Sequence, residues 1–168
     1  NSVVSIRGRV FAMCHLLEEI HVSESHPCFA VVDGVLYSKD LTRLICCPGG
    51  KEGVFRIPDH VTEIFCYAFL GCSSLTSIEI PDSVESIGNS AFGGCSSLTS
   101  IEIPYSVTSI GGWAFEGCSS LTSIEIPNSV TSIGESAFNG CSSLTSIDIP
   151  NSVVSIRGRV FAMCHLLE

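Results

Sequence analysis

The sequence predicts a β-rich solenoid, in which one short motif repeats along the chain and each copy forms one coil. Five cysteines and five prolines recur at a spacing of 23 residues: Cys72, Cys95, Cys118, Cys141 and Cys164, and Pro58, Pro81, Pro104, Pro127 and Pro150. The string GCSSLTSIEIP occurs unchanged at 71–81, 94–104 and 117–127. A period of about 20 to 29 residues with aliphatic residues in the pattern LxxIxI is the signature of leucine-rich repeats, whose apolar faces are buried only when coils stack. We therefore predict one leucine-rich-repeat solenoid over 1–168, with short parallel strands.

Each coil of the form LxxIxIPxxVxxIGxxAFxxC is expected to begin with a short strand. In the coil that starts at Leu75, Ile78 and Ile80 alternate with Glu79, so the isoleucines face inward and the glutamate faces solvent. Pro81 has no amide hydrogen and ends this strand. The spacing of Val84 and Ile87 before Gly88 favours a second short extended segment on the opposite wall.

The rest of the coil supplies two core columns. One aromatic residue per coil predicts a stacked ladder, formed by Phe69, Phe92, Phe115, Phe138 and Phe161. The cysteine column, to which Cys14 belongs as the copy of Cys164, is interpreted as small buried apolar residues. Neighbouring coils lie about 4.8 Å apart, but their Cβ vectors run parallel, so we favour free thiols over disulfides.

One coil is longer than the others and carries an inserted β-hairpin. The strand expected at Ile20–Val22 precedes the strand at Phe55–Ile57 by 35 residues. Within the extra chain, 29–32 and 35–37 flank the tight turn Asp33-Gly34, and 42–46 returns as a third strand. The loop 48–53 lacks the spacing of a phosphate-binding loop and is interpreted as a turn. The predicted organisation is therefore a coil over 1–22, the hairpin insertion over 23–54 and regular coils over 55–168.

The two ends of the chain have the same sequence. Residues 1–18 recur letter for letter at 151–168, an offset of 150 residues that suggests a 150-residue super-repeat. Neither end shows a polar cap, so each invites another coil to stack there. If that coil belongs to another chain, head-to-tail association gives a filament; if it belongs to the same chain, the protein is a long rod. An engineered duplication is the alternative. Because the chain begins at Asn1 without a leader, we interpret it as a mature or excised fragment.

Composition and motifs exclude several classes of function. With 17 acidic and 8 basic residues the net charge is −9, which argues against nucleic-acid partners. No apolar stretch reaches the roughly 18 residues of a membrane span, so membrane insertion is not expected. The sequence has no GxSxG, HExxH or Walker motif and no zinc quartet, so we predict no enzyme, no metal site and no cofactor.

The candidate binding surface is formed by outward positions of the first strand in each coil. These positions stack into a serine row and an acidic row, which together comprise Ser77, Glu79, Ser100, Glu102, Ser123, Glu125, Ser146 and Asp148. Carboxylates at coil spacing repel one another by on the order of 1 kcal/mol per pair, which a cationic partner or bound calcium relieves; the alternative is a solvated face. Arg56 stands in the acidic column and ends it. Trp113 replaces a serine and is a further candidate contact, or packs against a neighbouring coil.

On the motif LxxIxIPxxVxxIGxxAFxxC, the chain resembles the BspA-like, or Treponema pallidum type, leucine-rich repeats over its whole length. The resemblance implies a secreted or surface-displayed protein, adhesion to proteins or glycans of a host or matrix, and no catalytic residues. We therefore predict an extracellular or cell-surface binding and adhesion module; the alternative is a structural unit of a filament or surface layer. Phe65 and Arg157 stand where the motif has glycine, which puts the backbone at those two bends in question.

Overall fold

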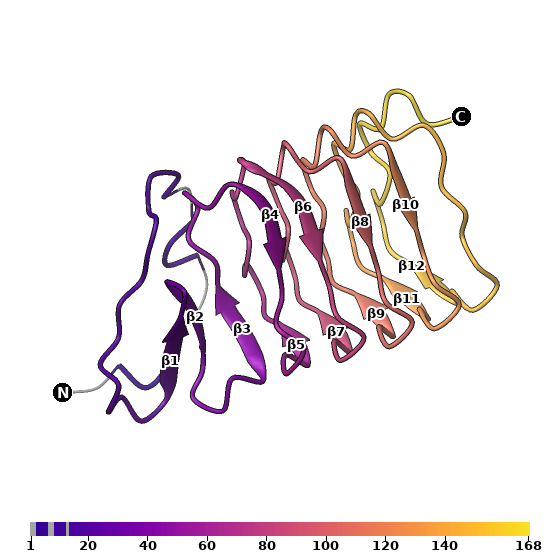
Figure 1. The fold of residues 1–168 in the computed structure, drawn as a ribbon. Helices are drawn as coiled ribbons and strands as arrows, with labels where there is room; N and C mark the ends of the chain where they lie inside the picture. The colour runs from indigo at the N-terminus through magenta and orange to yellow at the C-terminus, as the bar shows by residue number, and fades with distance from the viewer. Residues whose placement is uncertain (1–2, 7–8, 13) are drawn as a thin grey trace.

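The computed structural model describes residues 3–6, 9–12 and 14–168 and is a solenoid whose coils follow one another along a single axis (Figure 1). Short strands line two walls, and turns join them. Over the described residues the chain forms no helix, and therefore none long and apolar enough to cross a membrane. The predicted solenoid of short parallel strands is confirmed. Asn1, on which the interpretation of the chain as a mature or excised fragment depends, lies outside the described residues.

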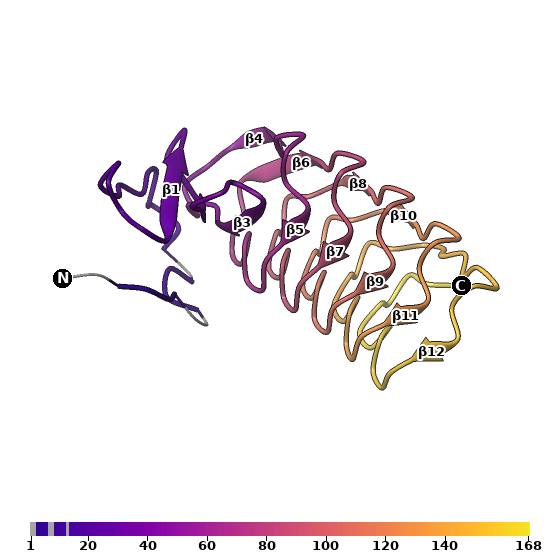
Figure 2. The ribbon, with the colours of Figure 1, turned by 90° about the horizontal axis from the view of Figure 1, so that it is seen from below.

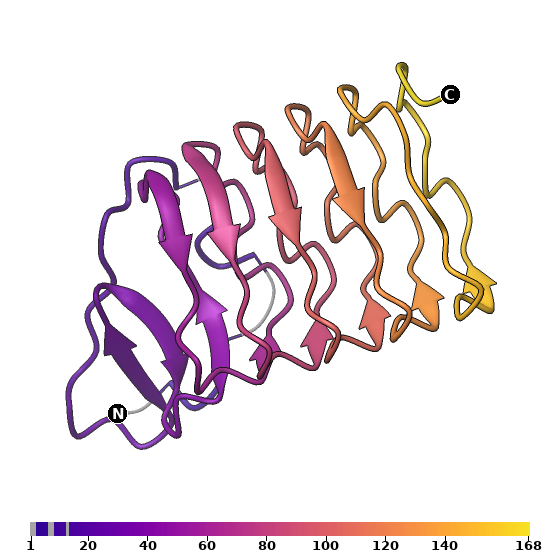
Figure 3. The same ribbon diagram turned by 45° about the vertical axis from the view of Figure 1, so that its right-hand side comes forward.

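Two sheets form the walls. The first, which we call the strand wall, is a parallel sheet of β4 (Gly53–Arg56), β6 (Leu75–Glu79), β8 (Ser100–Glu102) and β10 (Ser123–Glu125). Figure 3 shows these arrows running opposite to those that the regular coils contribute to the second wall. The second sheet has the order β1-β2-β3-β5-β7-β9-β11-β12, with β1 (Phe29–Val32), β2 (Val35–Ser38), β3 (Arg43–Cys46), β5 (Glu63–Ile64), β7 (Ser86–Ile87), β9 (Ser109–Ile110), β11 (Ser132–Ile133) and β12 (Ser155–Ile156).

The core lies between the walls and repeats with each coil. In the coil after β6, Val84, Phe92 and Cys95 are completely buried. The rings of Phe69, Phe92, Phe115 and Phe138 stack with centroids 5.2–5.3 Å apart, which confirms the aromatic ladder. The buried thiols of Cys95, Cys118 and Cys141 each donate to a backbone carbonyl of the preceding coil, as Cys118 Sγ does to the oxygen of Phe92 at 3.2 Å. Burial raises the pKa of the Cys141 thiol to about 12 and keeps these groups neutral.

The cysteine prediction holds inside the solenoid and fails at its ends. All the described cysteines are free thiols, and Cys72, Cys95, Cys118 and Cys141 are buried. Cys14 is exposed and Cys164 only half-buried. Within the described residues, these two cysteines have a coil stacked on one side at most. The interpretation of the whole column as buried is therefore wrong for them.

The insertion is the predicted hairpin with a third strand. β1 and β2 pair antiparallel around Asp33 and Gly34, whose φ angles of 50° and 77° form a tight two-residue turn. β3 pairs antiparallel with β2 and parallel with β5, so it links the hairpin to the regular coils. The expected strand at Ile20–Val22 is absent. Ile20 instead donates its amide to the carbonyl of Gly34 at 2.9 Å, which draws this segment toward the hairpin turn.

The glycine that follows the second strand of each coil allows close stacking. A Cβ built on Gly111 would lie 2.6 Å from the carbonyl carbon of Gly88 in the preceding coil. Phe65 avoids this conflict because β3, rather than a regular coil, precedes it; its amide bonds to Leu44. Arg157 does meet a regular coil, and there the stacking loosens: its amide lies 3.2 Å from the oxygen of Ile133, against 3.0 Å for the equivalent bond of Gly111. The Phe138 and Phe161 rings are correspondingly 5.8 Å apart.

Candidate binding surface

The strand wall presents the predicted rows because its strands alternate inward and outward residues. Ile78, Ile101 and Ile124 point into the core and are buried. Their neighbours point to solvent: Glu79, Glu102 and Glu125 are exposed, as are Ser100 and Ser123, and Ser77 is half-exposed. The polar face and the apolar core therefore arise from one period-two pattern.

Register places equivalent residues of successive coils side by side. Ser77 pairs with Ser100, and Ser100 with Ser123, across parallel strands. Glu125 is likewise opposite Glu102. Because parallel strands lie about 4.8 Å apart, the wall carries one carboxylate and one serine hydroxyl at each step along the axis.

The acidic row ends in an ion pair on the N-terminal side. Arg56 of β4 lies opposite Glu79, and its Nε is 3.1 Å from Glu79 Oε2. Among the described residues, Glu102 and Glu125 have no ion-pair partner. These two carboxylates are therefore the part of the row that is available to a positively charged group from outside.

The last predicted members of the rows are exposed but do not continue the sheet. Ser146 and Asp148 lie outside any strand, which corrects the expectation of a strand in this coil. Inter-coil bonding weakens toward this end: the amide–carbonyl distance is 3.2 Å for Thr99 to Thr76, 3.3 Å for Thr122 to Thr99 and 3.5 Å for Thr145 to Thr122. The ordered part of the surface is therefore β6, β8 and β10.

The wall is hollowed in two places that share Glu102. One shallow depression follows the rows themselves and is lined by Ser77, Glu79, Ser100, Glu102, Ser123 and Glu125. The other lies at the edge of the wall and is lined by Glu102, Asp59, Asp82 and Tyr105, among others. Tyr105 is 69% exposed and was missed by the sequence analysis. It follows Pro104 where other coils have aspartate or asparagine, and this departure from the repeat was the available signal.

Trp113 does not join this surface. It lies in the turn after β9 with a φ of 55°, and its amide donates to the oxygen of Glu135 at 2.8 Å. Its side chain is 38% exposed and borders a separate depression beside β9 and β11, together with Glu135 and Arg157. The structure thus separates the two candidate contacts, one on each wall.

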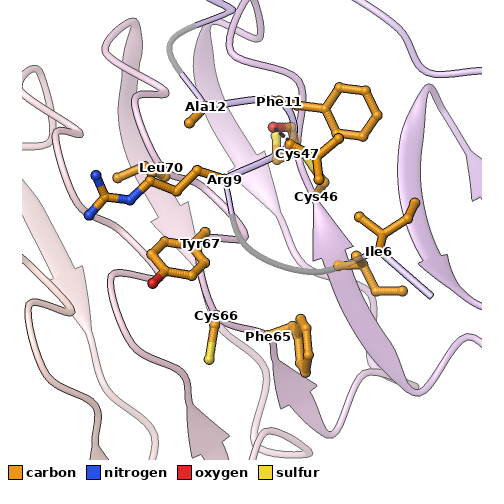
Figure 4. Close-up of a pocket in the computed structure, with 12 residues that line it drawn as sticks. Ile6, Arg9, Phe11, Ala12, Cys46, Cys47, Phe65, Cys66, Tyr67 and Leu70 are labelled. Carbon is orange, nitrogen blue, oxygen red and sulfur yellow. Dashed lines mark hydrogen bonds between the residues drawn. The ribbon is translucent and has the colours of Figure 1, made fainter.

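A fourth hollow lies toward the N-terminal end, between the described part of the N-terminal segment and β3 with the coil that follows it (Figure 4). Ile6 and Phe11 come from the N-terminal segment, and Cys46, Phe65 and Tyr67 face them from β3 and the next coil. The guanidinium of Arg9 lies over the Tyr67 ring, 5.5 Å from its centroid. Mostly apolar side chains line this site, which is a packing contact between chain segments.

No described group of three or more His, Cys, Asp or Glu side chains is arranged to hold a metal ion. The carboxylates of the strand wall stand one to a coil in a single line, so neighbouring coils do not surround a cation. A calcium ion on Glu102 and Glu125 stays a prediction.

Comparisons with known proteins agree with this architecture. The family model described as "BspA type Leucine rich repeat region" matches residues 54–168 in six copies. A leucine-rich cell surface protein from Faecalibacterium prausnitzii is 38% identical with a TM-score of 0.87, over 94% of this chain and 42% of that one. The pneumococcal vaccine antigen PcpA is 32% identical with a TM-score of 0.80, over 89% and 38%.

A Treponema pallidum leucine-rich repeat protein is also similar, with 36% identity and a TM-score of 0.71 over 79% of this chain and 65% of that one. No curated protein matches the chain. The chain spans less than two thirds of the length of each of the three solved relatives named above.

Proposed function

We propose that this chain, which belongs to the BspA-type leucine-rich repeat family, is a secreted or cell-surface adhesion module that holds its partner on the strand wall. A solenoid of this family is a repeat protein suited to protein interaction, because stacked coils give an extended surface. Such repeats are typically binding modules without catalysis. The observation that carries the proposal is the registered row of Glu102 and Glu125, exposed and without an ion-pair partner among the described residues.

The chemistry of the wall favours a partner with regularly spaced basic groups. Two carboxylates at strand spacing repel each other, and a Lys or Arg side chain between them removes that repulsion and gains charge-assisted hydrogen bonds. The serine hydroxyls beside them donate and accept hydrogen bonds, which suits backbone amides or the hydroxyls of a glycan. The net charge of −9 speeds the approach of a basic partner.

Tyr105 extends the proposed contact beyond the acidic row. Its exposed ring stands in the depression that contains Glu102, Asp59 and Asp82. Exposed aromatic rings at interfaces supply apolar contact area and stack on the cation of Lys or Arg. A basic side chain placed on Glu102 therefore has an aromatic neighbour as well as an acidic one.

An extracellular location is part of the same proposal. The Faecalibacterium relative is described as a cell surface protein, and we extend that location to this chain. Proteins or glycans of a host or matrix are the partners we expect there.

Binding of the whole chain to printed arrays of mammalian glycans and purified extracellular matrix proteins tests the proposal. The variant Glu102→Gln/Glu125→Gln should bind the array partner, meaning the glycan or matrix protein that the wild type binds, with a Kd at least about tenfold higher, because two charge-assisted contacts are lost. The matched control Glu85→Gln/Glu135→Gln makes the same change of charge at exposed positions away from the strand wall and should bind like the wild type. Equal weakening in both variants would show that net charge alone, and not the row, attracts the partner.

A further inference from the structure

The wall opposite the strand wall carries a hollow of its own. The hollow lies beside β9 and β11 and is bordered by Trp113, and Figure 2 shows these two strands on the other side of the solenoid from β8 and β10. Trp113 is the one tryptophan in the sequence. A ligand in this hollow therefore lies beside a ring whose fluorescence reports it, and away from the carboxylates of the strand wall.

The backbone at Trp113 does not require a large side chain. Its φ of 55° is in the left-handed region, which bulky residues seldom adopt. Ser90 and Ser136 occupy the same position in the two adjacent coils with φ angles of 52° and 54°, and both serines are buried. A serine is thus sufficient to build this turn. The tryptophan places an exposed aromatic ring on a strained backbone, which is typical of a functional site.

The Trp113 ring is available to stack on a ligand. Within the part of the chain that the structure describes, the ring forms no aromatic pair and no cation–π pair. The residue is 38% exposed. Because Ser90 and Ser136 are small and buried, neither extends beside the ring to cover it.

A missing side chain opens the floor of the hollow beside this ring. Asn89, Gly112 and Glu135 occupy one position in three successive coils. A Cβ built on Gly112 would lie 3.3 Å from the carbonyl oxygen of Glu135 and 3.6 Å from Asn89 Oδ1, so a longer side chain there would fill the space between its neighbours. The Gly112 amide donates to Asn89 Oδ1 at 2.7 Å, which fixes the Asn89 side chain and leaves its Nδ2 group to donate to a ligand.

Polar groups line the rest of the hollow. Ser132 of β11 is paired with Ser109 of β9 and Ser155 of β12, so three hydroxyls follow one another at about 4.8 Å. Glu135 supplies the single carboxylate of the lining and Arg157 the single guanidinium, so the formal charge of the lining is zero. The hollow therefore favours neither an anion nor a cation, although the chain as a whole carries a net charge of −9.

The same strands are poorly suited to a peptide. β9 and β11 each have a hydrogen-bonded strand on both sides, so neither has a free edge to which an extended peptide could add. Ile110 and Ile133 are buried and give no pocket for an apolar side chain. The ligand that fits has one apolar face for the tryptophan and many hydroxyl groups for the polar lining.

We propose that this hollow binds a neutral sugar ring of an oligosaccharide, stacked on Trp113. A pyranose ring carries apolar C–H groups on its faces, which fit against an indole ring, and hydroxyl groups around its rim. Those hydroxyls both donate and accept hydrogen bonds, as do Ser109, Ser132 and the fixed amide of Asn89. The site is distinct from the strand wall, whose carboxylates favour a basic partner.

Fluorescence titration of the whole chain tests the proposal, because Trp113 is its single reporter. The probes are hexasaccharides of glucose, mannose, galactose and N-acetylglucosamine, each added up to millimolar concentration. At least one should shift the emission to shorter wavelength in a saturable way. The strand-wall variant Glu102→Gln/Glu125→Gln should give the same titration as the wild type, so the failure of one site is distinguishable from the failure of the other.

Variants at two glycines of one column test the geometry of the hollow. Gly112→Asn introduces the side chain that the preceding coil carries at this position and should raise the Kd at least about tenfold. Gly158→Asn is the matched control, because it makes the same change two coils further on, where an added Cβ meets nothing within 4 Å, and it should bind like the wild type. Trp113→Ser should abolish binding in isothermal titration calorimetry.

The proposal is overturned if no hexasaccharide changes the emission of Trp113, if Gly112→Asn and Gly158→Asn bind alike, or if Trp113→Ser keeps the wild-type Kd. Thermal unfolding verifies that each variant is folded. Both adjacent coils carry serine at the position of Trp113, so Trp113→Ser should fold and keeps the test decisive even if Gly112→Asn disturbs the stacking of the coils.

Discussion

Replacing Gly111 by alanine should destabilise the solenoid by about 2–4 kcal/mol, because the stacking distance between coils leaves no space for a methyl group. The added Cβ would lie 2.6–2.7 Å from three backbone atoms of Gly88 and Asn89, which cannot rotate away. To reach ordinary contact at about 3.4 Å the coils must separate by about 0.8 Å. Separation on that scale breaks the bond from the Gly111 amide to the oxygen of Ile87, now 3.0 Å, and weakens its neighbours, at about 1 kcal/mol per bond, in addition to the loss of packing.

Urea unfolding followed by circular dichroism measures this change, with Gly158→Ala as the matched control. A Cβ on Gly158 meets nothing within 4 Å, so this variant should change stability by less than about 0.5 kcal/mol. Because coils interact only with their neighbours, Gly111→Ala should also broaden the transition or divide it in two. Equal stability of the two alanine variants would refute the argument that this glycine column sets the stacking distance.

Three further changes should have measurable effects. Arg157→Gly should stabilise the chain by about 1 kcal/mol in the same urea assay, because it removes a Cβ from the glycine column where stacking is loosest; a loss of stability would contradict this. The free energy of unfolding should be constant below about pH 9 and should fall as the pH rises from 9 to 12. Burial raises the pKa of the Cys46 thiol from about 9 to about 12, so in this range the unfolded chain loses a proton that the folded chain keeps. Each such thiol should cost about 1.4 kcal/mol at pH 10, and a pH-independent urea midpoint would be evidence against it. Iodoacetamide should modify Cys14 in the native protein and Cys95 only after unfolding, as measured by peptide mass spectrometry. Equal modification rates of Cys14 and Cys95 in the native protein would show that Cys95 is not buried.

The sequence predicts the interior of the solenoid well because its rules are local and repeated. Period-two alternation around Ile78 and the 23-residue column of Phe92 need no knowledge of neighbouring coils beyond their presence. The hairpin is equally local, because Asp33 and Gly34 favour a tight turn wherever they stand between two apolar runs. These elements are confirmed as expected.

The conformation of the first and last described coils and the arrangement of the surface residues depend on contacts with other segments, which the repeat motif does not specify. Ile20–Val22 matches the strand pattern, yet the Gly34 carbonyl is a competing partner for its amide. Asp148 matches the acidic row, yet the sheet loosens before it. The replacement of a serine by Trp113 predicts a contact residue, but the sequence column does not state which wall the residue borders, and the structure places it beside β9 and β11. Tyr105 stands where the other coils have aspartate or asparagine, so the repeating pattern assigns it no role.

Carboxyl footprinting of the whole chain with and without its array partner tests most directly whether the strand wall is the binding surface. Carbodiimide coupling with glycine ethyl ester labels exposed carboxylates, and peptide mass spectrometry reads each site. We predict that the partner protects Glu102 and Glu125 while Glu85 and Glu135 are labelled as in the free chain. Unchanged labelling of Glu102 and Glu125, or protection of Glu135 beside Trp113 instead, would contradict the account.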